Sequence, residues 1–268
     1  MDRAELCLYE VTNGVAQLTL NRPERRNGMT GDLELAFFER LGQAAADREV
    51  RAIVVTGAGA AFCVGADLSG ERGGDAEPLP NSKIPGNYPL GIPKPTIAAI
   101  NGACAGVGLV HALQCDVRFA ARGAKLTTAF ARRGLIAEYA ISWLLTQIAG
   151  RAVALDLLLS ARVIDADEAL ALGLVHRVCE PDQVLAEAAA YAADLAANVS
   201  PASMATIKRQ INRESFLDND AALAEAVAVM RESGGGPDAK EGIGSFLQRR
   251  PPSFAPLGEG TRYRWMQD

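Results

Sequence analysis

The first part of the chain combines strand-like and helix-like patterns of apolar residues. Residues 5–11 and 15–20 alternate apolar and polar side chains on either side of Asn13-Gly14, which predicts a β-hairpin. Apolar residues at helical spacing follow, and either Thr30 or Asp32 is suited to cap that helix. Strand and helix patterns therefore succeed one another from the start of the chain.

Continuous apolar runs predict further buried strands, and longer periodic stretches predict helices between them. The strands are expected at 51–56, 95–101 and 116–121, and the helices at 33–46, 106–114, 139–148 and 153–159. Asp165 or Asp167 is expected to cap a short helix that ends at Gly173. Charged residues on the predicted helices are expected on solvated faces. Recurring strand–turn–helix units of this kind indicate an α/β fold.

The last third of the chain is predicted to be almost entirely helical. Four helices are expected there, at 183–199, 201–213, 218–232 and 238–248. We therefore expect two parts, an α/β core over residues 1–198 and an α-helical region over residues 199–268. Residues 69–95 are rich in glycine, proline and charge and lack periodicity, which predicts a long loop.

Composition and charge argue against several classes of partner. The 268 residues are 49% apolar and 22% charged, with a net charge of −5, so nothing suggests the basic face that nucleic acid requires. The N-terminus lacks a basic segment followed by an apolar core, and no run reaches about 18 uninterrupted apolar residues. We therefore expect no signal peptide and no membrane partner, and a cytoplasmic location.

Cysteine and histidine are arranged unlike the ligands of a metal site. The five cysteines are odd in number and show no C-x-x-C spacing, which is typical of buried thiols in a reducing compartment. The two histidines, His111 and His176, are not clustered with cysteine. We therefore expect no metal.

Two glycine-containing segments follow predicted strands and carry the candidate chemistry. Residues 57–68 contain two glycines of a dinucleotide fingerprint, but the third is missing and no helix pattern opens after it. Gly65-Ala66-Asp67 instead offers backbone that can approach a ligand without a bulky side chain between them. Residues 94–108 read as a strand, a glycine turn and the start of a helix.

The start of that helix is suited to stabilise negative charge. A helix N-terminus leaves amide N–H groups unpaired and carries a partial positive charge. Beside a carbonyl that becomes an enolate, such amides form an oxyanion hole, and removing one donor typically costs about 3 kcal/mol of transition-state stabilisation. The same segment could equally be a close-packed corner between strand and helix.

Taken together, several motifs in order resemble the crotonase superfamily, the enoyl-CoA hydratase/isomerase family. The resemblance extends from about residue 5 to residue 253. The matching pieces are LNRPERRN at 20–27, VVTGAGAAFCVGADL at 54–68, KPTIAAINGACAGVG at 94–108, CDVRFA at 115–120, IDADEA at 164–169 and GLV at 173–175.

The resemblance implies a fold, a substrate and an assembly. The fold is a superhelix of stacked ββα units with an α-helical C-terminal trimerisation region. The substrate is an acyl-CoA thioester, with no cofactor beyond the coenzyme A that it carries. The assembly is a homotrimer or a dimer of trimers, in which Phe246 and Arg249 of the last helix could reach coenzyme A on a neighbouring subunit.

The resemblance also implies site residues. The backbone N–H groups of Ala66 and Val107 would hold the thioester oxygen. Relatives usually have glycine at the position of Val107, so this side chain narrows the pocket. The coenzyme A arm would be lined by residues of three segments, namely Arg26, Gly28, Gly65, Ala66, Asp67, Leu68 and Val107.

The sequence departs from the hydratases at their two glutamates. Aligned on residues 106–116 and 124–134, those positions hold Val110 and Phe130, and neither side chain can transfer a proton. Asp116 is expected to end the helix and to be structural. If the alignment holds, hydration by the two-glutamate route is excluded.

One acid remains, within residues 134–141. Glu138 lies in an apolar stretch, where desolvation is expected to raise its pKa towards that of a useful base. Its position resembles that of the single acid in the Δ3,Δ2-enoyl-CoA isomerases of the family. The alternative is a solvated glutamate in the first turn of the helix predicted from Tyr139.

The resulting hypothesis is an enzyme that shifts a 3-enoyl-CoA to a 2-enoyl-CoA with Glu138 as its single base. Its rivals are an enoyl-CoA hydratase, another enolate reaction such as thioester hydrolysis, and a non-catalytic acyl-CoA-binding protein. His111 is expected in the core or at the surface, and Tyr139 and Trp143 in the core, although each could face the acyl pocket.

Overall fold

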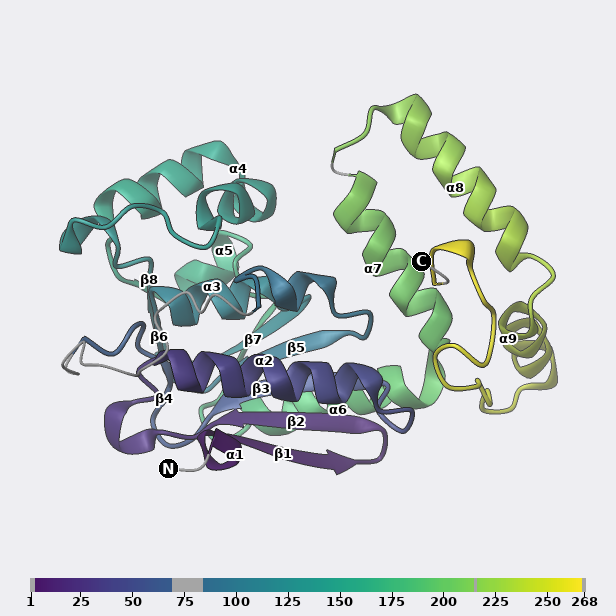
Figure 1. Ribbon diagram of the computed structural model, residues 1–268, viewed down its shortest axis with the longest axis horizontal. Helices are drawn as coiled ribbons and strands as arrows, with labels where there is room; N and C mark the ends of the chain where they lie inside the picture. The colour runs from purple at the N-terminus through teal and green to yellow at the C-terminus, as the bar shows by residue number, and fades with distance from the viewer. Residues whose placement is uncertain (1–2, 69–83, 215, 267–268) are drawn as a thin grey trace.

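The computed structural model describes residues 3–68, 84–214 and 216–266, and within them two β-sheets and a series of helices (Figure 1). The larger sheet has six strands in the order β1-β2-β3-β5-β7-β10. The pair β1–β2 is antiparallel, and the other neighbours are parallel. These strands are β1 Cys7–Thr12, β2 Val15–Leu20, β3 Ala52–Gly57, β5 Thr96–Ile100, β7 Val117–Ala121 and β10 Arg177–Cys179.

The hairpin and the buried strands are confirmed, with a correction at the N-terminus. Residues Arg3–Leu6 form a short helix, α1, and the first strand begins only at Cys7. Leu6 is buried while the residues before it are more exposed, so the alternation that predicted a strand from residue 5 also fits one helical turn.

A second, smaller sheet was not predicted from the sequence. Its order is β4-β6-β8-β9, with bounds β4 Ala61–Cys63, β6 Ala103–Ala105, β8 Lys125–Thr127 and β9 Ile164–Asp165. Strands of two or three residues are too short to show periodicity. The chain passes from the first sheet to the second at Gly57 and Gly102, where a Cβ atom would collide with the backbone of Ala61 and Ala60. Strands β3 and β5 of the larger sheet are thus each followed by a strand of the smaller sheet, β4 and β6 respectively, which leads into the candidate site.

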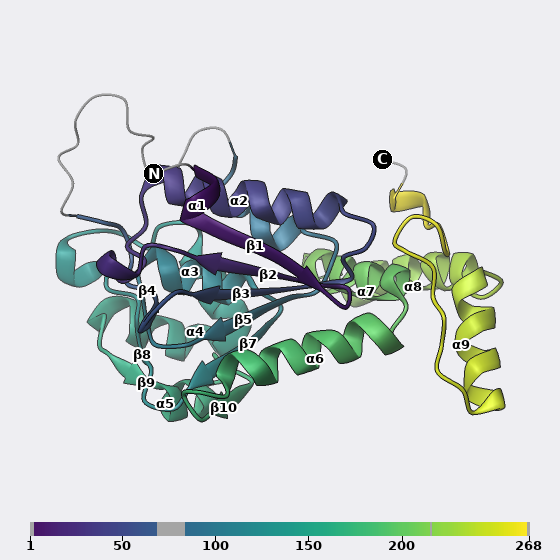
Figure 2. The ribbon, with the colours of Figure 1, turned by 90° about the horizontal axis from the view of Figure 1, so that it is seen from below.

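Helices cover both faces of the larger sheet. α2 (Gly31–Ala46) lies on one face and α6 (Val184–Asn198) on the other (Figure 2). Thr30, not Asp32, caps α2, because its hydroxyl accepts a hydrogen bond of 3.2 Å from the Leu33 N–H. α3 (Val107–Gln114) is buried along its whole length beside α2. The core therefore lies between the sheet and these helices.

The remaining helices follow the predicted pattern. Asp165 caps α5 by accepting from the Glu168 N–H. The short segments are α5 Ala166–Ala171 and the 3₁₀ turns η1 Pro23–Arg25, η2 Tyr88–Gly91, η3 Ala131–Arg133 and η4 Arg264–Met266.

α4 (Ile141–Ser160) is apolar and long enough, by length and composition alone, to pass as a membrane span, with a mean hydropathy of 1.3. Gly150 interrupts it, because its φ of 78° and ψ of 164° are not helical. The break falls where the sequence predicted two helices. Neither half approaches the roughly 20 residues that a span requires.

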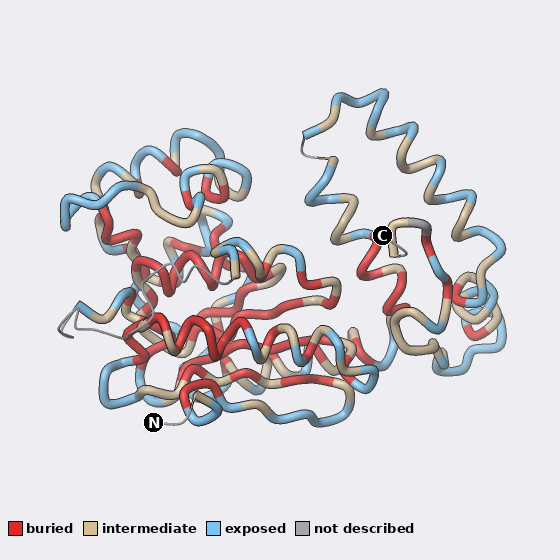
Figure 3. The backbone as a smooth tube through the Cα atoms, in the orientation of Figure 1, coloured by how far each residue is buried: buried red, intermediate tan, exposed pale blue. Residues whose placement is uncertain are grey.

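Three helices form an arm that extends away from the sheets (Figure 1). They are α7 Pro201–Glu214, α8 Asn219–Ser233 and α9 Pro237–Gln248. Buried residues concentrate in the core, whereas α8 and α9 are largely exposed (Figure 3). The division into residues 1–198 and 199–268 remains a prediction, but α6 packs on the sheet and α7 to α9 make up the arm.

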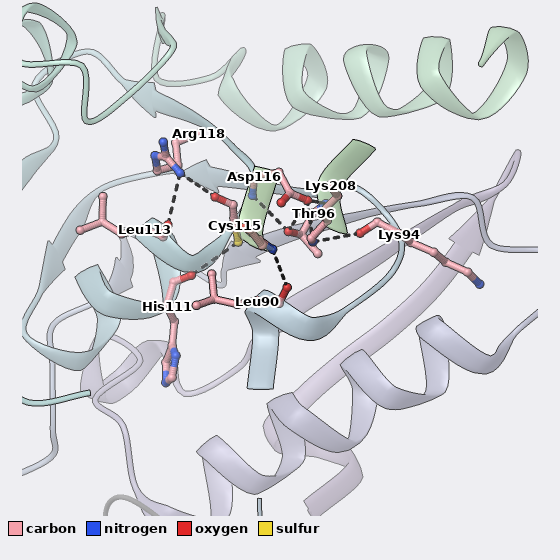
Figure 4. Close-up of polar contacts among 10 residues, drawn as sticks. Leu90, Lys94, Thr96, His111, Leu113, Cys115, Asp116, Arg118 and Lys208 are labelled. Atoms are coloured by element: carbon pink, nitrogen blue, oxygen red, sulfur yellow. Dashed lines mark hydrogen bonds and ion pairs between the residues drawn. The ribbon is translucent and has the colours of Figure 1, made fainter. Parts of the chain in front are cut away.

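Asp116 links the arm to the core (Figure 4). Its carboxylate accepts hydrogen bonds from the backbone N–H of Thr96 at 2.8 Å and from the hydroxyl of the same residue at 3.0 Å. Lys208 on α7 donates to the same carboxylate at 2.8 Å and to the Lys94 carbonyl at 3.3 Å. Asp116 is therefore structural, as predicted.

Candidate functional site

The segment after η1 lies beside the segment after β4. The Met29 N–H donates to the Gly65 carbonyl and the Asp67 N–H donates to the Met29 carbonyl, each at 2.8 Å. This pattern is a parallel bridge between Met29 and Ala66. In such a bridge the N–H of the bridged residue points to the opposite side, so the Ala66 N–H points away from Met29.

On that opposite side the chain meets the start of α3. Gly65 has a φ of +97°, and a Cβ atom there would lie 3.2 Å from the Ala105 carbonyl oxygen. A Cβ atom on Gly106 would lie 3.5 Å from the Gly65 Cα. The two glycine segments that the sequence singled out are therefore in contact, and glycine permits the approach.

Val107 is the first residue of α3, so its N–H belongs to the turn whose amides have no acceptor within the helix. Gly106, at the N-cap with a φ of +51°, provides no side chain to cap them. The Val107 side chain is 3% exposed and packs into the core. The structure thus brings Ala66 and the N-terminal end of α3 onto adjoining backbone segments.

A buried network that the sequence reasoning missed holds these segments in place. Arg22 pairs with Asp67 at 3.0 Å, with only 16% and 12% of the two side chains exposed. The Asn27 side chain is fully buried, accepts from the Arg22 N–H at 2.8 Å, and donates to the carbonyls of Ala58 and Ala61. The signal available was the stretch LNRPERRN at residues 20–27, in which Arg22 and Asn27 stand five residues apart.

The residues proposed for coenzyme A differ in exposure. Gly28 and Gly65 are buried and Asp67 is partly buried, whereas Arg26, Ala66 and Leu68 are exposed. Gly28 lies against Asp67, since a Cβ atom there would be 3.4 Å from the Asp67 Cβ. Of the loop predicted at residues 69–95, residues 69–83 lie outside the described residues, and the remainder contains the 3₁₀ turn η2.

Glu138 precedes a turn of unusual backbone conformation. Tyr139 and Ala140 have φ angles of +54° and +57°, in the left-handed region that side-chain-bearing residues seldom adopt. Helix α4 consequently begins at Ile141, whose N–H donates to the Glu138 carbonyl at 3.0 Å. The helix predicted from Tyr139 starts two residues later, and Glu138 lies in the loop before it, with its side chain partly buried. Strained backbone of this kind concentrates at functional sites.

A pocket of about 590 Å³ opens beside this turn. Tyr139 and Trp143 line it, together with Gln114 of α3 and Phe216 just beyond α7. The Trp143 and Phe216 rings stack with their centroids 5.6 Å apart. Tyr139 and Trp143, expected in the core, are thus pocket residues as well.

Val110 and Phe130, which the resemblance aligns with the two hydratase glutamates, are buried apolar side chains. Val110 is fully buried on α3, and Phe130 is 5% exposed just before η3. All five cysteines are buried, as predicted, and burial raises the pKa of Cys63, next to the Gly65 segment, to about 12. Cys63 is therefore protonated near neutral pH and is unsuited to nucleophilic attack.

The fold and the site define a class of protein. It is an α/β protein in which the backbone segment that carries Ala66 contacts the start of the buried helix α3. The chain matches the family model for enoyl-CoA hydratase/isomerase over residues 10–256. It belongs to the enoyl-CoA hydratase/isomerase family, within the crotonase superfamily.

Individual relatives match over nearly their whole length. A 1,2-epoxyphenylacetyl-CoA isomerase of Escherichia coli is 36% identical, covering 93% of this chain and 98% of the relative. Among solved structures, an enoyl-CoA hydratase from Polaromonas is 31% identical with a TM-score of 0.84, covering 92% of this chain and 99% of that one. One from Mycobacterium marinum is 47% identical with a TM-score of 0.69, covering 79% and 98%. The crotonase fold predicted from the sequence is confirmed.

Proposed function

We propose that the protein isomerises a 3-enoyl-CoA to the conjugated 2-enoyl-CoA, with Glu138 as its single base. One observation carries the proposal. Glu138, the acid that the sequence singles out, precedes a strained turn whose Tyr139 and Ala140 line a pocket, and the positions that the resemblance aligns with the hydratase glutamates hold Val110 and Phe130. The E. coli relative, named as an isomerase of a CoA ester, supports this direction.

In the proposed reaction, the Ala66 and Val107 N–H groups donate to the thioester oxygen. The Glu138 carboxylate removes a proton from C2, and the electrons of that bond pass to the thioester oxygen to give a dienolate. The same proton returns from the Glu138 carboxyl to C4, so the double bond moves from C3–C4 to C2–C3. No water is consumed, which agrees with apolar side chains at positions 110 and 130.

The surrounding roles are proposed by resemblance. Arg26, Gly28, Gly65, Asp67 and Leu68 would line the coenzyme A arm, and no cofactor beyond the coenzyme A of the substrate is required. We also propose a homotrimer or a dimer of trimers. α9, with Phe246 81% exposed, lies at the far end of the molecule from β4 and β6, so it would serve a neighbouring subunit (Figure 1).

The test is conversion of a 3-enoyl-CoA, followed by the absorbance of the conjugated thioester. Wild-type protein should conjugate it, and Glu138→Gln should lose at least about 100-fold in kcat. Glu10→Gln, on exposed β1, is the matched control and should behave as wild type. Turnover unchanged in Glu138→Gln would reject this base.

Hydratase activity is the second candidate, because most relatives carry that name. It is tested by loss of the 2-enoyl-CoA absorbance in water. Fast hydration by the wild type would replace the isomerase proposal. Binding of the CoA ester without any turnover would favour the acyl-CoA-binding alternative, and release of free CoA thiol would favour thioester hydrolysis.

A further inference from the structure

The pocket beside the Glu138 turn has an aromatic wall, which the transfer of a proton does not by itself require. Of the eleven described residues that line it, four are aromatic, namely Tyr88, Tyr139, Trp143 and Phe216. Aromatic residues make up only 6% of the chain. The concentration of rings in this wall therefore indicates what kind of ligand the pocket accepts, because the composition of the chain does not account for it.

The pocket lies between the core and the arm. η2, the last residue of α3 and the start of α4 form its core side, and Phe216, just beyond α7, belongs to its arm side. The Leu90 carbonyl of η2 accepts a hydrogen bond from the Asn212 side chain of α7 at 3.2 Å, which holds this end of the arm against the core (Figure 4). The tertiary fold thus brings together rings that are distant in the chain.

Trp143 and Phe216 are the part of the wall that best matches a planar ring. Their own rings are parallel to within 3°, with centroids 5.6 Å apart. Phe216 is nevertheless 71% exposed, and large apolar side chains left exposed at a cavity mark binding surfaces. A ligand ring that packs on this pair would cover Phe216 and would add ring–ring attraction to the burial of apolar area.

The polar groups at this wall are already engaged or buried. The Gln114 Nε2 donates to the Gly86 carbonyl at 2.9 Å, and its Oε1 lies 3.1 Å from the His111 Nδ1. The Asn212 amide serves the arm as described above. The Tyr139 hydroxyl is buried, so it adds no polar group to the surface of the cavity. The pocket therefore favours an apolar group over one that requires several hydrogen bonds.

The pocket continues from the proposed site of proton transfer. Its lining residues Tyr139 and Ala140 directly follow Glu138. Gln114, which also lines it, is the last residue of α3, whereas Val107 is the first. Since an eight-residue α-helix rises about 10 Å from its first residue to its last, the pocket is placed to receive the end of the acyl group and not the thioester.

We propose that this pocket accepts an aromatic ring at the end of the acyl chain, so that the substrate is an aryl-substituted 3-enoyl-CoA, with Trp143 and Phe216 as specificity-determining residues. The thioester oxygen would lie at the Ala66 and Val107 N–H groups and the double bond beside Glu138. The ring takes no part in the chemistry, in which the proton still leaves C2 and returns to C4. This inference rests on the proposed function, because it names the acyl group of the same reaction.

The first experiment measures binding without turnover. It compares two saturated thioesters that differ only in the ring, 6-phenylhexanoyl-CoA and 6-cyclohexylhexanoyl-CoA, neither of which has a double bond to move. A pocket that is merely apolar binds the cyclohexyl ester at least as tightly as the phenyl ester. We expect calorimetry to give the phenyl ester a Kd about 3- to 10-fold lower. Equal Kd values, or a lower Kd for the cyclohexyl ester, would overturn the proposal.

Variants then test the two residues. Phe216→Leu and Trp143→Leu each remove a ring but keep an apolar side chain, so each should reduce the preference for phenyl to less than about twofold. Tyr9→Leu, which removes a ring on β1 outside the pocket, should keep the wild-type preference. Phe216 is mostly exposed, so its variant remains a valid test if Trp143→Leu proves unstable. A preference that survives in Phe216→Leu would overturn the role of the pair.

Turnover separates this inference from the proposed function. Wild-type protein should conjugate 6-phenyl-3-hexenoyl-CoA with a kcat/KM about 3- to 10-fold above that for the cyclohexyl analogue. Conjugation of both at equal rates would overturn the aromatic pocket and leave the isomerase proposal intact. Tighter binding of the phenyl ester without any conjugation would do the reverse. If Phe216→Leu changes the oligomeric state and leaves the preference unaltered, a second copy of the chain covers this surface and the proposal is wrong.

Discussion

At the scale of single residues, the candidate site depends on close backbone contact between Gly65 and the start of α3. Side chains at this point would separate the segments that carry Ala66 and Val107. Behind them, Asn27 and the Arg22–Asp67 pair hold the first segment from the other side. These contacts can thus position the backbone N–H groups of Ala66 and Val107, although neither residue contributes a catalytic side chain.

Gly65→Ala should damage the site more than it damages the fold. Its Cβ atom would lie 3.2 Å from the Ala105 carbonyl oxygen, at a φ of +97°. Gly123→Ala is the matched control, because Gly123 has a φ of +83° with no atom within 4 Å of its Cβ position. Each should lose about 1 kcal/mol of stability in urea unfolding, but only Gly65→Ala should lose about tenfold or more in kcat/KM. Equal activity of the two variants would contradict the close-contact interpretation.

At the scale of elements, the C-terminal end of α2 is joined to the start of β5 by one buried lysine. Lys94 is 5% exposed and its ammonium group donates to the Ala44 carbonyl at 2.8 Å and to the Asp47 carbonyl. Positive charge at a helix C-terminus is favourable. Burial nevertheless lowers the pKa of Lys94 to about 8, so desolvation outweighs this attraction.

The lowered pKa of Lys94 predicts a pH dependence of stability. Between about pH 8 and the ordinary lysine value of 10.5, the unfolded chain binds more protons at this site than the folded chain. The contribution of Lys94 to the free energy of unfolding should therefore rise with pH across this window. In urea unfolding, the free energy of unfolding of the wild type minus that of Lys94→Met should therefore increase from pH 8 to pH 10. Exposed Lys125→Met should show no such trend, and a flat difference for Lys94→Met would refute the shift.

At the scale of the whole molecule, the arm exposes apolar side chains that its own core does not cover. Ile243, Phe246 and Leu247 on α9 are 63%, 81% and 73% exposed. Exposed apolar patches of this kind mark interaction surfaces. The proposed trimer supplies an occupant, namely a second copy of the chain.

Phe246→Glu should therefore weaken self-association. A buried charge at an apolar interface is costly, so the variant should shift towards monomer in sedimentation or light-scattering measurements at micromolar concentration. Val11→Glu, on the exposed face of β1, should leave the assembly unchanged. A wild type that is monomeric at these concentrations would reject the trimer itself.

Local chemistry along the chain was sufficient for the long elements. The hairpin at Asn13-Gly14, the cap of α2, the break at Gly150 and the helical C-terminal region all depend on neighbours in sequence, so their residue types predict them. The order of motifs likewise predicted the crotonase fold, and the two glycine segments predicted which backbone would meet.

Only the tertiary structure decided the rest, because those features depend on residues that are distant in the chain. The small sheet has strands of two or three residues that are stable only beside one another. Glu34 lies on a helix whose charged residues were expected in solvent, yet α3 and Tyr139 bury it completely. The same packing accompanies the left-handed turn at Tyr139 and delays α4 to Ile141. The sequence by itself thus determined which residues are candidates for the chemistry. Packing decided the backbone conformation of the turn that follows Glu138.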